Sequence, residues 1–232
     1  MAARPAAGGG FWVEVGAERF ARWCDGFGDR HGGLTGADLS GEPETQVLEL
    51  AGGDGATASC HVPFPPLELQ AASAESPPQP QAAVGALAAH ALVDRRIGVL
   101  LVRRGGYAAG LFSGTRLLDH KVGSRYVQGK TKAGGWSQQR YARRREGQAR
   151  EAYAAAAEAA AKILLPVTDT LDALVTGGDA AAIAVLRAET RLAPLWAKER
   201  GPFLNVGDPR LDDLRQCPQT FRAVRIRLVE PA

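Results

Sequence analysis

The feature that most constrains the fold is a long helix-compatible segment over residues 137–165. It is rich in alanine, the best helix former, and it contains no proline before Pro166, whose ring cannot be accommodated inside a helix. Ser137 is a preferred N-cap, because its hydroxyl can accept a hydrogen bond from a backbone N–H of the first turn. Gly147 costs about 1 kcal/mol relative to alanine, which the surrounding alanines tolerate. The pattern therefore predicts one long helix that starts at Ser137 and ends before Pro166.

Most other periodic segments are short strands. The apolar run at 97–102 is typical of a strand that is buried on both faces, and residues 107–114 and 115–123 are expected to complete an antiparallel meander. Further strands are predicted at 11–15, in a hairpin over 45–64, at 172–179 and at 221–229, and a second helix at 180–189. Because strands and helices are mixed without strict alternation, we expect an α+β fold with a mixed β-sheet and packed helices.

The segment 71–86 is low in complexity and rich in Pro, Ala and Gln, which indicates a loop or linker. We therefore expect two parts, a smaller β-containing part over 1–86 and a larger domain over 87–232. No apolar run approaches the ~18 residues that a membrane span needs, and the first residues lack the apolar core of a signal peptide. The sequence thus predicts a cytoplasmic protein without membrane association.

Positive charge is concentrated in one segment. Residues 121–150 hold nine Lys or Arg and one acidic residue, Glu146, which gives this segment a net charge of +8. The rest of the chain holds 19 basic and 24 acidic residues, a net charge of −5. An acidic body with one basic patch suits a phosphate-rich partner such as nucleic acid. A solvated helix face is the alternative, but such a face usually mixes charges of both signs.

A glycine pair inside the basic segment, Gly134 and Gly135, is followed by Trp136, Ser137 and Gln138. Glycines let the backbone approach a substrate closely, and a helix start offers unpaired N–H groups and a positive dipole end. A glutamine amide donates and accepts hydrogen bonds but has no useful pKa. Gln138 can therefore hold a water in line with an ester carbonyl while N–H groups stabilise the oxyanion. An ordinary first-turn glutamine explains the same spacing equally well.

Basic side chains stand on both sides of this turn. Arg140, Arg143 and Arg144 are three to four residues apart on the predicted helix, so they share one face. Lys130 and Lys132 precede the glycines. We expect these five side chains to contact backbone phosphates.

Two other kinds of site are disfavoured. "GSRYVQGKT" at 123–131 is similar to a nucleotide-binding loop, but it has five residues where that motif needs four, and no helix begins at its lysine. Cys24, Cys60 and Cys217 match no zinc or disulfide spacing, so we expect buried or free thiols, no metal and no cofactor. His120 is the histidine nearest in sequence to Gln138 and the glycines before it, and we expect a structural role for it.

The segment "YVQGKTKAGGWSQQRYARRREGQAREAY" resembles the Gly-x-x-Gln loop of the release-factor-like peptidyl-tRNA hydrolases of actinobacteria, which are bacterial relatives of the eukaryotic ribosome-quality-control release factor. "DALVTGGD" and the closing "DPRL…FRAVRI" also resemble that family. The resemblance covers 95–232 well and the beginning of the chain weakly. It implies a domain similar to the catalytic domain of eukaryotic and archaeal class I release factors. It further implies hydrolysis of the ester between a nascent peptide and tRNA on stalled or split large ribosomal subunits.

By motif match, Gly135 and Gln138 correspond to the loop glycine and the catalytic glutamine of the family. The same match implies that Lys130, Lys132 and Arg140 lie near tRNA or ribosomal RNA. The implied partners are the large ribosomal subunit, the tRNA acceptor end with ribosomal RNA, and the nascent peptide, and we expect the chain to act as a monomer.

The loop departs from the Gly-Gly-Gln of true release factors, because Trp136 and Ser137 separate Gly135 from Gln138. The loop can therefore place Gln138 differently. Eukaryotic relatives can instead cut the tRNA near its 3′ end. Three functions stay open from the sequence: ester hydrolysis, cleavage of the tRNA acceptor end, and non-catalytic binding of ribosomes or RNA.

Overall fold

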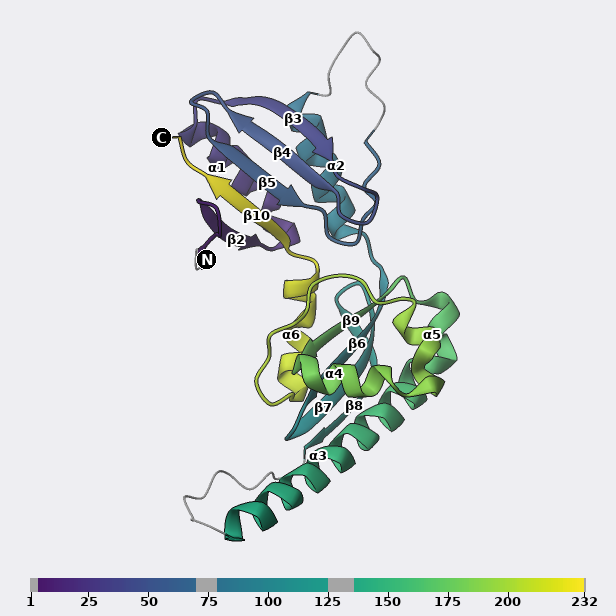
Figure 1. Cartoon of the computed structure of the whole chain (residues 1–232). Coiled ribbons are helices and arrows are strands. Elements are labelled where there is room, and N and C mark those ends of the chain that lie inside the picture. The colour runs from purple at the N-terminus through teal and green to yellow at the C-terminus, as the bar shows by residue number, and fades with distance from the viewer. Residues whose placement is uncertain (1–3, 70–78, 125–135, 232) are drawn as a thin grey trace. The chain divides into compact units, whose positions relative to one another are not determined.

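The computed structural model describes residues 4–69, 79–124 and 136–231, and for 136–146 it describes the backbone alone. The chain divides into two compact units (Figure 1). One is formed by Met1–Val93 with Gln219–Ala232, and the other by Asp94–Pro218. The sequence placed the boundary at residue 86 and assigned everything after it to one domain. The structure divides the chain differently, because the last strand completes the sheet of the first unit.

The first unit contains a six-stranded antiparallel sheet with the order β1-β2-β10-β5-β4-β3. The C-terminal strand β10 (Val224–Val229) lies between β2 (Phe11–Val15) and β5 (Thr57–His61). The remaining elements of this unit are β1 (Arg4–Pro5), η1 (Ala17–Arg19), α1 (Phe20–Arg30), β3 (Leu34–Ser40), β4 (Val47–Gly52) and α2 (Pro80–Leu92). Both helices contribute buried side chains to the core on one face of this sheet.

Helix α2 corrects one sequence prediction. A loop was expected over 71–86, and this is wrong from Pro80 onward, where α2 begins. Proline is favoured in the first turn of a helix, since its missing N–H is not needed there. The side chains that α2 buries in the core are Ala83, Val84, Leu87 and Ala91. Burial against the sheet thus stabilises a helix where composition alone indicated a linker.

The second unit contains a four-stranded sheet with the order β8-β7-β6-β9 (Figure 1). Strands β6 (Arg96–Arg103), β7 (Gly106–Ser113) and β8 (Arg116–Ser124) form the predicted antiparallel meander, and β9 (Ala173–Gly178) adds to β6 in parallel. Its helices are α3 (Trp136–Ile163), η2 (Leu165–Thr170), α4 (Ala180–Arg187), η3 (Thr190–Leu192) and α5 (Ala193–Trp196). Helix α6 (Leu211–Phe221) contains the boundary between the two units, which follows Pro218. The α+β class with a mixed sheet is confirmed.

Helices cover both faces of the second sheet. Leu100 of β6 is buried in one cluster with Ala156 of α3 and Ile183 of α4. On the other face, a Cβ added to Gly110 of β7 would meet the side chain of Leu214 on α6. This burial on both sides explains the continuous apolar run of β6. In the described part of the chain, no helix is apolar over a length sufficient to cross a bilayer.

Candidate functional site

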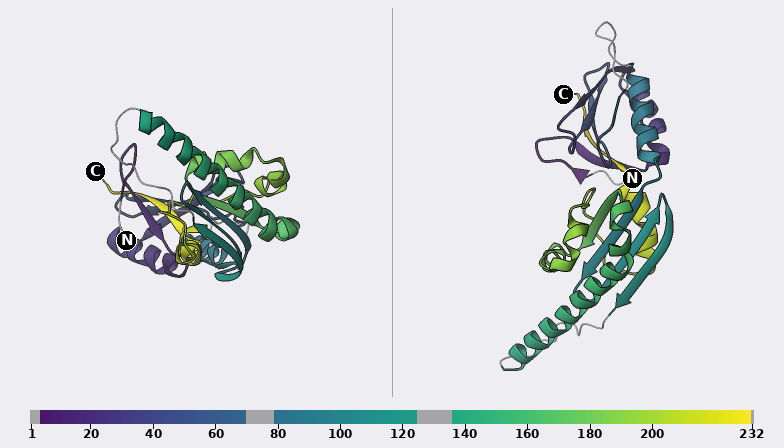
Figure 2. Two further views of the ribbon diagram at one scale, coloured as in Figure 1. Left: turned by 90° about the horizontal axis from the view of Figure 1, so that it is seen from below. Right: turned by 90° about the vertical axis from the view of Figure 1, so that its right-hand side faces the viewer.

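Helix α3 is anchored at one end and extends past the sheet at the other. It has 28 residues, which corresponds to a length of about 42 Å at 1.5 Å per residue. Among the described side chains of α3, burial begins at Ala152 and continues to Ile163. Figures 1 and 2 show the first turns of α3 beyond the end of the four-stranded sheet. By the same rise per residue, Gln138 lies roughly 20 Å along the helix from Ala152.

Trp136, Ser137 and Gln138 are the first three residues of α3. The predicted N-cap role of Ser137 is therefore wrong, because an N-cap residue has a non-helical backbone, whereas α3 already includes the residue before Ser137. Gln138 lies in the first turn, where backbone N–H groups have no acceptor within the helix. The start of α3 thus places the Gln138 position beside backbone N–H groups that have no acceptor within the helix.

The basic residues predicted to bind phosphate divide into two groups. Arg140, Arg143 and Arg144 lie in the first turns of α3, and the helical spacing places these positions on one face. Gly134, Gly135, Lys130 and Lys132 lie outside the described residues. The structure therefore brings Gln138 and three arginines to one helix end, and the roles of all these residues stay predictions.

Strand β8 leads into this region from the sheet. Ser124 is its last residue, and residues 125–135 connect it to α3. His120 on β8 is exposed, and its ring makes no hydrogen bond or ion pair with any described residue. The structure therefore gives no support for a structural role of His120.

A polar cavity next to Ser124 was not predicted from the sequence. Its volume is about 940 Å³, and its charged lining consists of Arg103, Arg104, Asp179, Asp208 and Arg210. These residues come from three separate stretches of the chain. The available sequence signals were the arginine pair before the glycines at 105–106 and the "DPR" at 208–210.

The cysteines cannot supply a reactive thiolate near neutral pH. Cys24, Cys60 and Cys217 are buried and unpaired, which confirms the prediction of buried or free thiols. Burial raises the pKa of Cys24 and of Cys217 to about 12, and it raises the pKa of Cys60 well above its ordinary value. Within residues 4–69, 79–124 and 136–231, no three His, Cys, Asp or Glu side chains gather as metal ligands.

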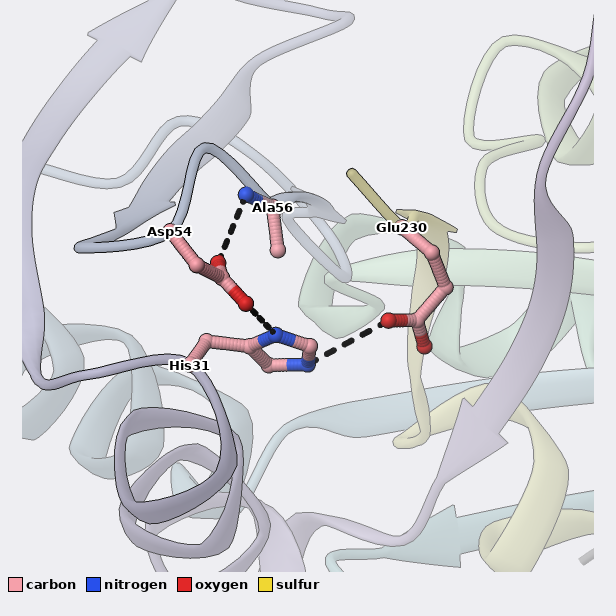
Figure 3. A network of polar contacts seen from close by, with 4 residues as sticks. All are labelled: His31, Asp54, Ala56 and Glu230. Carbon is pink, nitrogen blue, oxygen red and sulfur yellow. Dashed lines mark hydrogen bonds and ion pairs between the residues drawn. The ribbon is translucent and has the colours of Figure 1, made fainter. Parts of the chain in front are cut away.

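A network of titratable groups in the first unit joins three segments (Figure 3). His31, at the end of α1, is buried between Asp54 and Glu230. Its Nδ1 donates to Asp54 Oδ2 at 2.9 Å, and its Nε2 lies 3.6 Å from Glu230 Oε2. The Ala56 N–H also donates to Asp54 Oδ1 at 3.0 Å, and these two contacts, the Ala56 bond foremost, lower the pKa of Asp54 below its usual value. Because the network contains no Ser, Thr or Cys side chain that the His31–Asp54 pair could activate, we interpret it as a structural contact between the three segments.

Residues 95–227, more than half of the chain, match a family of release factors. The chain belongs to this family, whose model is described as the Actinobacteria/chloroflexi VLRF1 release factor. Membership of this family relates the chain to translation. The family resemblance inferred from the sequence is confirmed.

Solved structures also match the chain, among them two of low sequence identity. The crystal structure of the archaeal translation termination factor aRF1 is 18% identical with a TM-score of 0.40, and the match covers 71% of this chain and 46% of that one. A structure described as "Archaeal protein" is 16% identical with a TM-score of 0.40, and the match covers 75% of this chain and 52% of that one. The match thus spans about half the length of each archaeal chain. No curated protein matches the chain.

Proposed function

We propose that this chain hydrolyses the ester bond of peptidyl-tRNA on stalled or split large ribosomal subunits and so releases the nascent chain. The observation that carries the proposal is the position of Gln138 in the first turn of α3, directly after the basic segment. A helix N-terminus stabilises negative charge through its dipole and its unpaired N–H groups. Membership of a release-factor family supports the same reaction class.

In this mechanism the Gln138 amide positions a water molecule against the ester carbonyl. Backbone N–H groups at the loop and helix start stabilise the oxyanion that forms, and Gly135 allows the backbone to approach the ester closely. Glutamine cannot act as a base, so the proton of the water passes to the substrate. The water oxygen bonds to the carbonyl carbon, and the ribose oxygen of the tRNA leaves as a hydroxyl.

We assign the binding step to the basic side chains around the loop. Arg140, Arg143 and Arg144, with Lys130 and Lys132, contact phosphates of the tRNA acceptor end and of ribosomal RNA. Each contact releases condensed counterions and so makes affinity dependent on salt. The protein acts as a monomer at cytoplasmic ribosomes.

The test uses large ribosomal subunits that carry a labelled nascent peptide on tRNA. Wild-type protein or Gln138→Ala is added, and peptidyl-tRNA, free peptide and tRNA are separated on a gel. Free peptide with full-length tRNA, produced by the wild type alone, is the expected result. A tRNA shortened at its 3′ end would contradict ester hydrolysis and indicate nuclease activity instead. Tight binding without any product would assign the chain to non-catalytic RNA-binding proteins.

A further inference from the structure

The cavity of about 940 Å³ lies wholly within the second unit. Three segments line it: the turn between β6 and β7 with the end of β8, the start of α4, and the residues that lead into α6. Its polar and charged lining residues are Arg103, Arg104, Ser124, Asp179, Asp208 and Arg210. The volume is within the range of about 300–1,000 Å³ that is usual for small-ligand sites.

The strand register places this cavity beside the end of β8, where the chain leaves the sheet. Arg103 of β6 pairs with Gly106 of β7, and Gly106 pairs with Ser124 of β8, so the three residues form one row across the sheet. Paired residues point to the same face, and this is the face on which Leu214 of α6 packs. Ser124 is also the last described residue before 125–135, the segment that connects β8 to α3 in sequence. The cavity is therefore next to the point where this segment begins.

The arginines of the cavity differ in how they are held. Arg103 donates from Nη1 to the Val206 carbonyl at 3.1 Å, which fixes its side chain. Arg104 and Arg210 are exposed, and neither side chain forms an ion pair with any residue that the structure describes. Their guanidinium groups are thus available to an anion, and guanidinium groups bind phosphate through paired, charge-assisted hydrogen bonds.

The carboxylates restrict what that anion can be. Asp179 caps α4 and accepts from the Ala181 N–H at 3.0 Å. Asp208 makes no ion pair within the described residues, and it lies beside Gly105, where an added Cβ would be 3.3 Å from its Oδ1. Three arginines and two aspartates leave one unit of positive charge. This balance suits one phosphodiester whose neighbouring ribose or base presents hydrogen-bond donors to a carboxylate.

We propose that this cavity binds one nucleotide of single-stranded RNA. The phosphate lies between Arg104 and Arg210, and Asp208 accepts a hydrogen bond from the ribose 2′-hydroxyl, the group that distinguishes RNA from DNA. The assignment of RNA as the ligand rests on the proposed function, since a protein that acts on peptidyl-tRNA meets single-stranded RNA at the tRNA 3′ end. The site would add an RNA contact near Ser124, at the end of β8, to the contacts proposed for the start of α3.

The experiment measures binding of a short fluorescent single-stranded RNA by anisotropy, with the full chain. Arg104→Ala combined with Arg210→Ala is expected to weaken binding about tenfold and to reduce the salt slope by about 0.7 for each lost phosphate contact. Arg116→Ala is the matched control, because Arg116 is an exposed arginine at the opposite end of β8. An unchanged affinity of the double variant, or an equal loss with Arg116→Ala, would overturn the proposal. Because both substituted side chains are exposed, the melting temperature should stay that of the wild type.

Two further arms identify the ligand more closely. Asp208→Ala is expected to remove the preference for RNA over DNA of the same sequence, and an unchanged preference would overturn the contact to the ribose hydroxyl. Inorganic phosphate is expected to compete weakly with the RNA. Displacement by phosphate at the same concentration as by a mononucleotide would indicate a bare anion site instead.

The outcomes separate this inference from the proposed function. Normal RNA binding by the double variant, together with peptide release by the wild type, would reject the cavity and leave the hydrolase proposal standing. RNA binding that depends on Arg104 and Arg210, in a protein that releases no peptide, would support the cavity and reject the hydrolase.

Discussion

The two halves of helix α3 differ in composition and in environment. From Ala152 to Ile163 the helix is rich in alanine, and these small side chains pack against the sheet. From Trp136 to Glu146 it contains four arginines and extends past the sheet. A continuous helix transmits position through its backbone hydrogen bonds. The comparison teaches that packing of one half of a helix fixes the position of the other half, which here holds the residues with a proposed function.

The largest expected effect is on the packed half. Ala160 is fully buried in the core of the second unit, so Ala160→Glu places an unpaired charge among apolar side chains. We expect it to destabilise the protein by at least ~3 kcal/mol. Ala154 is exposed on the same helix, and Ala154→Glu is the control, with a free energy of unfolding within about 0.5 kcal/mol of the wild type. Urea unfolding compares the two, and equal stabilities would contradict the anchoring role of this half.

The link between the halves is tested by insertion of one alanine after Gly147. One extra residue rotates the first turns of α3 by about 100° and moves them by about 1.5 Å relative to the packed half. We expect peptide release to fall about 100-fold, since small misplacements are costly in catalysis, with an unchanged melting temperature. Gly147→Ala without insertion is the control and should release peptide normally, because a Cβ at Gly147 meets no other atom within 4 Å. Full release by the insertion variant would show that α3 does not orient Gln138.

Asp54→Asn separates stability from function in the first unit. The pKa of Asp54 is lowered in the folded protein, so its ionised form stabilises the fold at neutral pH. This contribution is lost as the pH falls from the ordinary aspartate range through the lowered pKa. We therefore expect Asp54→Asn to reduce the melting temperature at pH 7 but not at a pH below both pKa values, with peptide release unchanged. An equal loss at both pH values would refute the electrostatic origin of this stabilisation.

The smallest expected effect concerns salt. Arg143→Ala in the extended half should reduce the slope of log affinity against log salt for the large ribosomal subunit by about 0.7–0.9, the value for one phosphate contact. Lys162→Ala changes an exposed base in the packed half and should leave the slope unchanged. A titration of subunit binding between low and physiological salt measures both. Identical slopes for the two variants would remove the distinction between the halves in RNA binding.

Local patterns predicted most of the second unit. The meander β6–β8 and helix α3 follow from apolar runs, turns and alanine content. In β10 of the first unit, the predicted alternation holds for buried Val224 and Ile226 beside exposed Arg225, whereas Arg227 and Leu228 are both half-buried. Helix α1 was missed, because two glycines, Gly26 and Gly28, lower its helix propensity. Burial of its Phe20, Cys24 and Phe27 overrides that propensity.

Long-range arrangement could not be predicted in the same way. The pairing of β10 with β2 and β5 joins strands that are far apart in sequence, so nothing in β10 itself indicates it. The cavity could not be predicted for the same reason, because only the fold brings Arg104 and Arg210 into one lining. The candidate site, in contrast, could be predicted from the sequence, because its glycines, basic residues and Gln138 lie within one short segment of the chain.

The central claim is that Gln138 carries out chemistry and does not merely support binding. The most direct measurement is the single-turnover rate of peptide release at saturating protein, together with the dissociation constant for the same ribosomal subunits. We expect Gln138→Ala to lower the rate at least ~100-fold, the usual effect of losing an oriented catalytic group, with an unchanged dissociation constant. The neighbouring Gln139→Ala should match the wild type in both quantities. Release by Gln138→Ala at the wild-type rate would contradict the account.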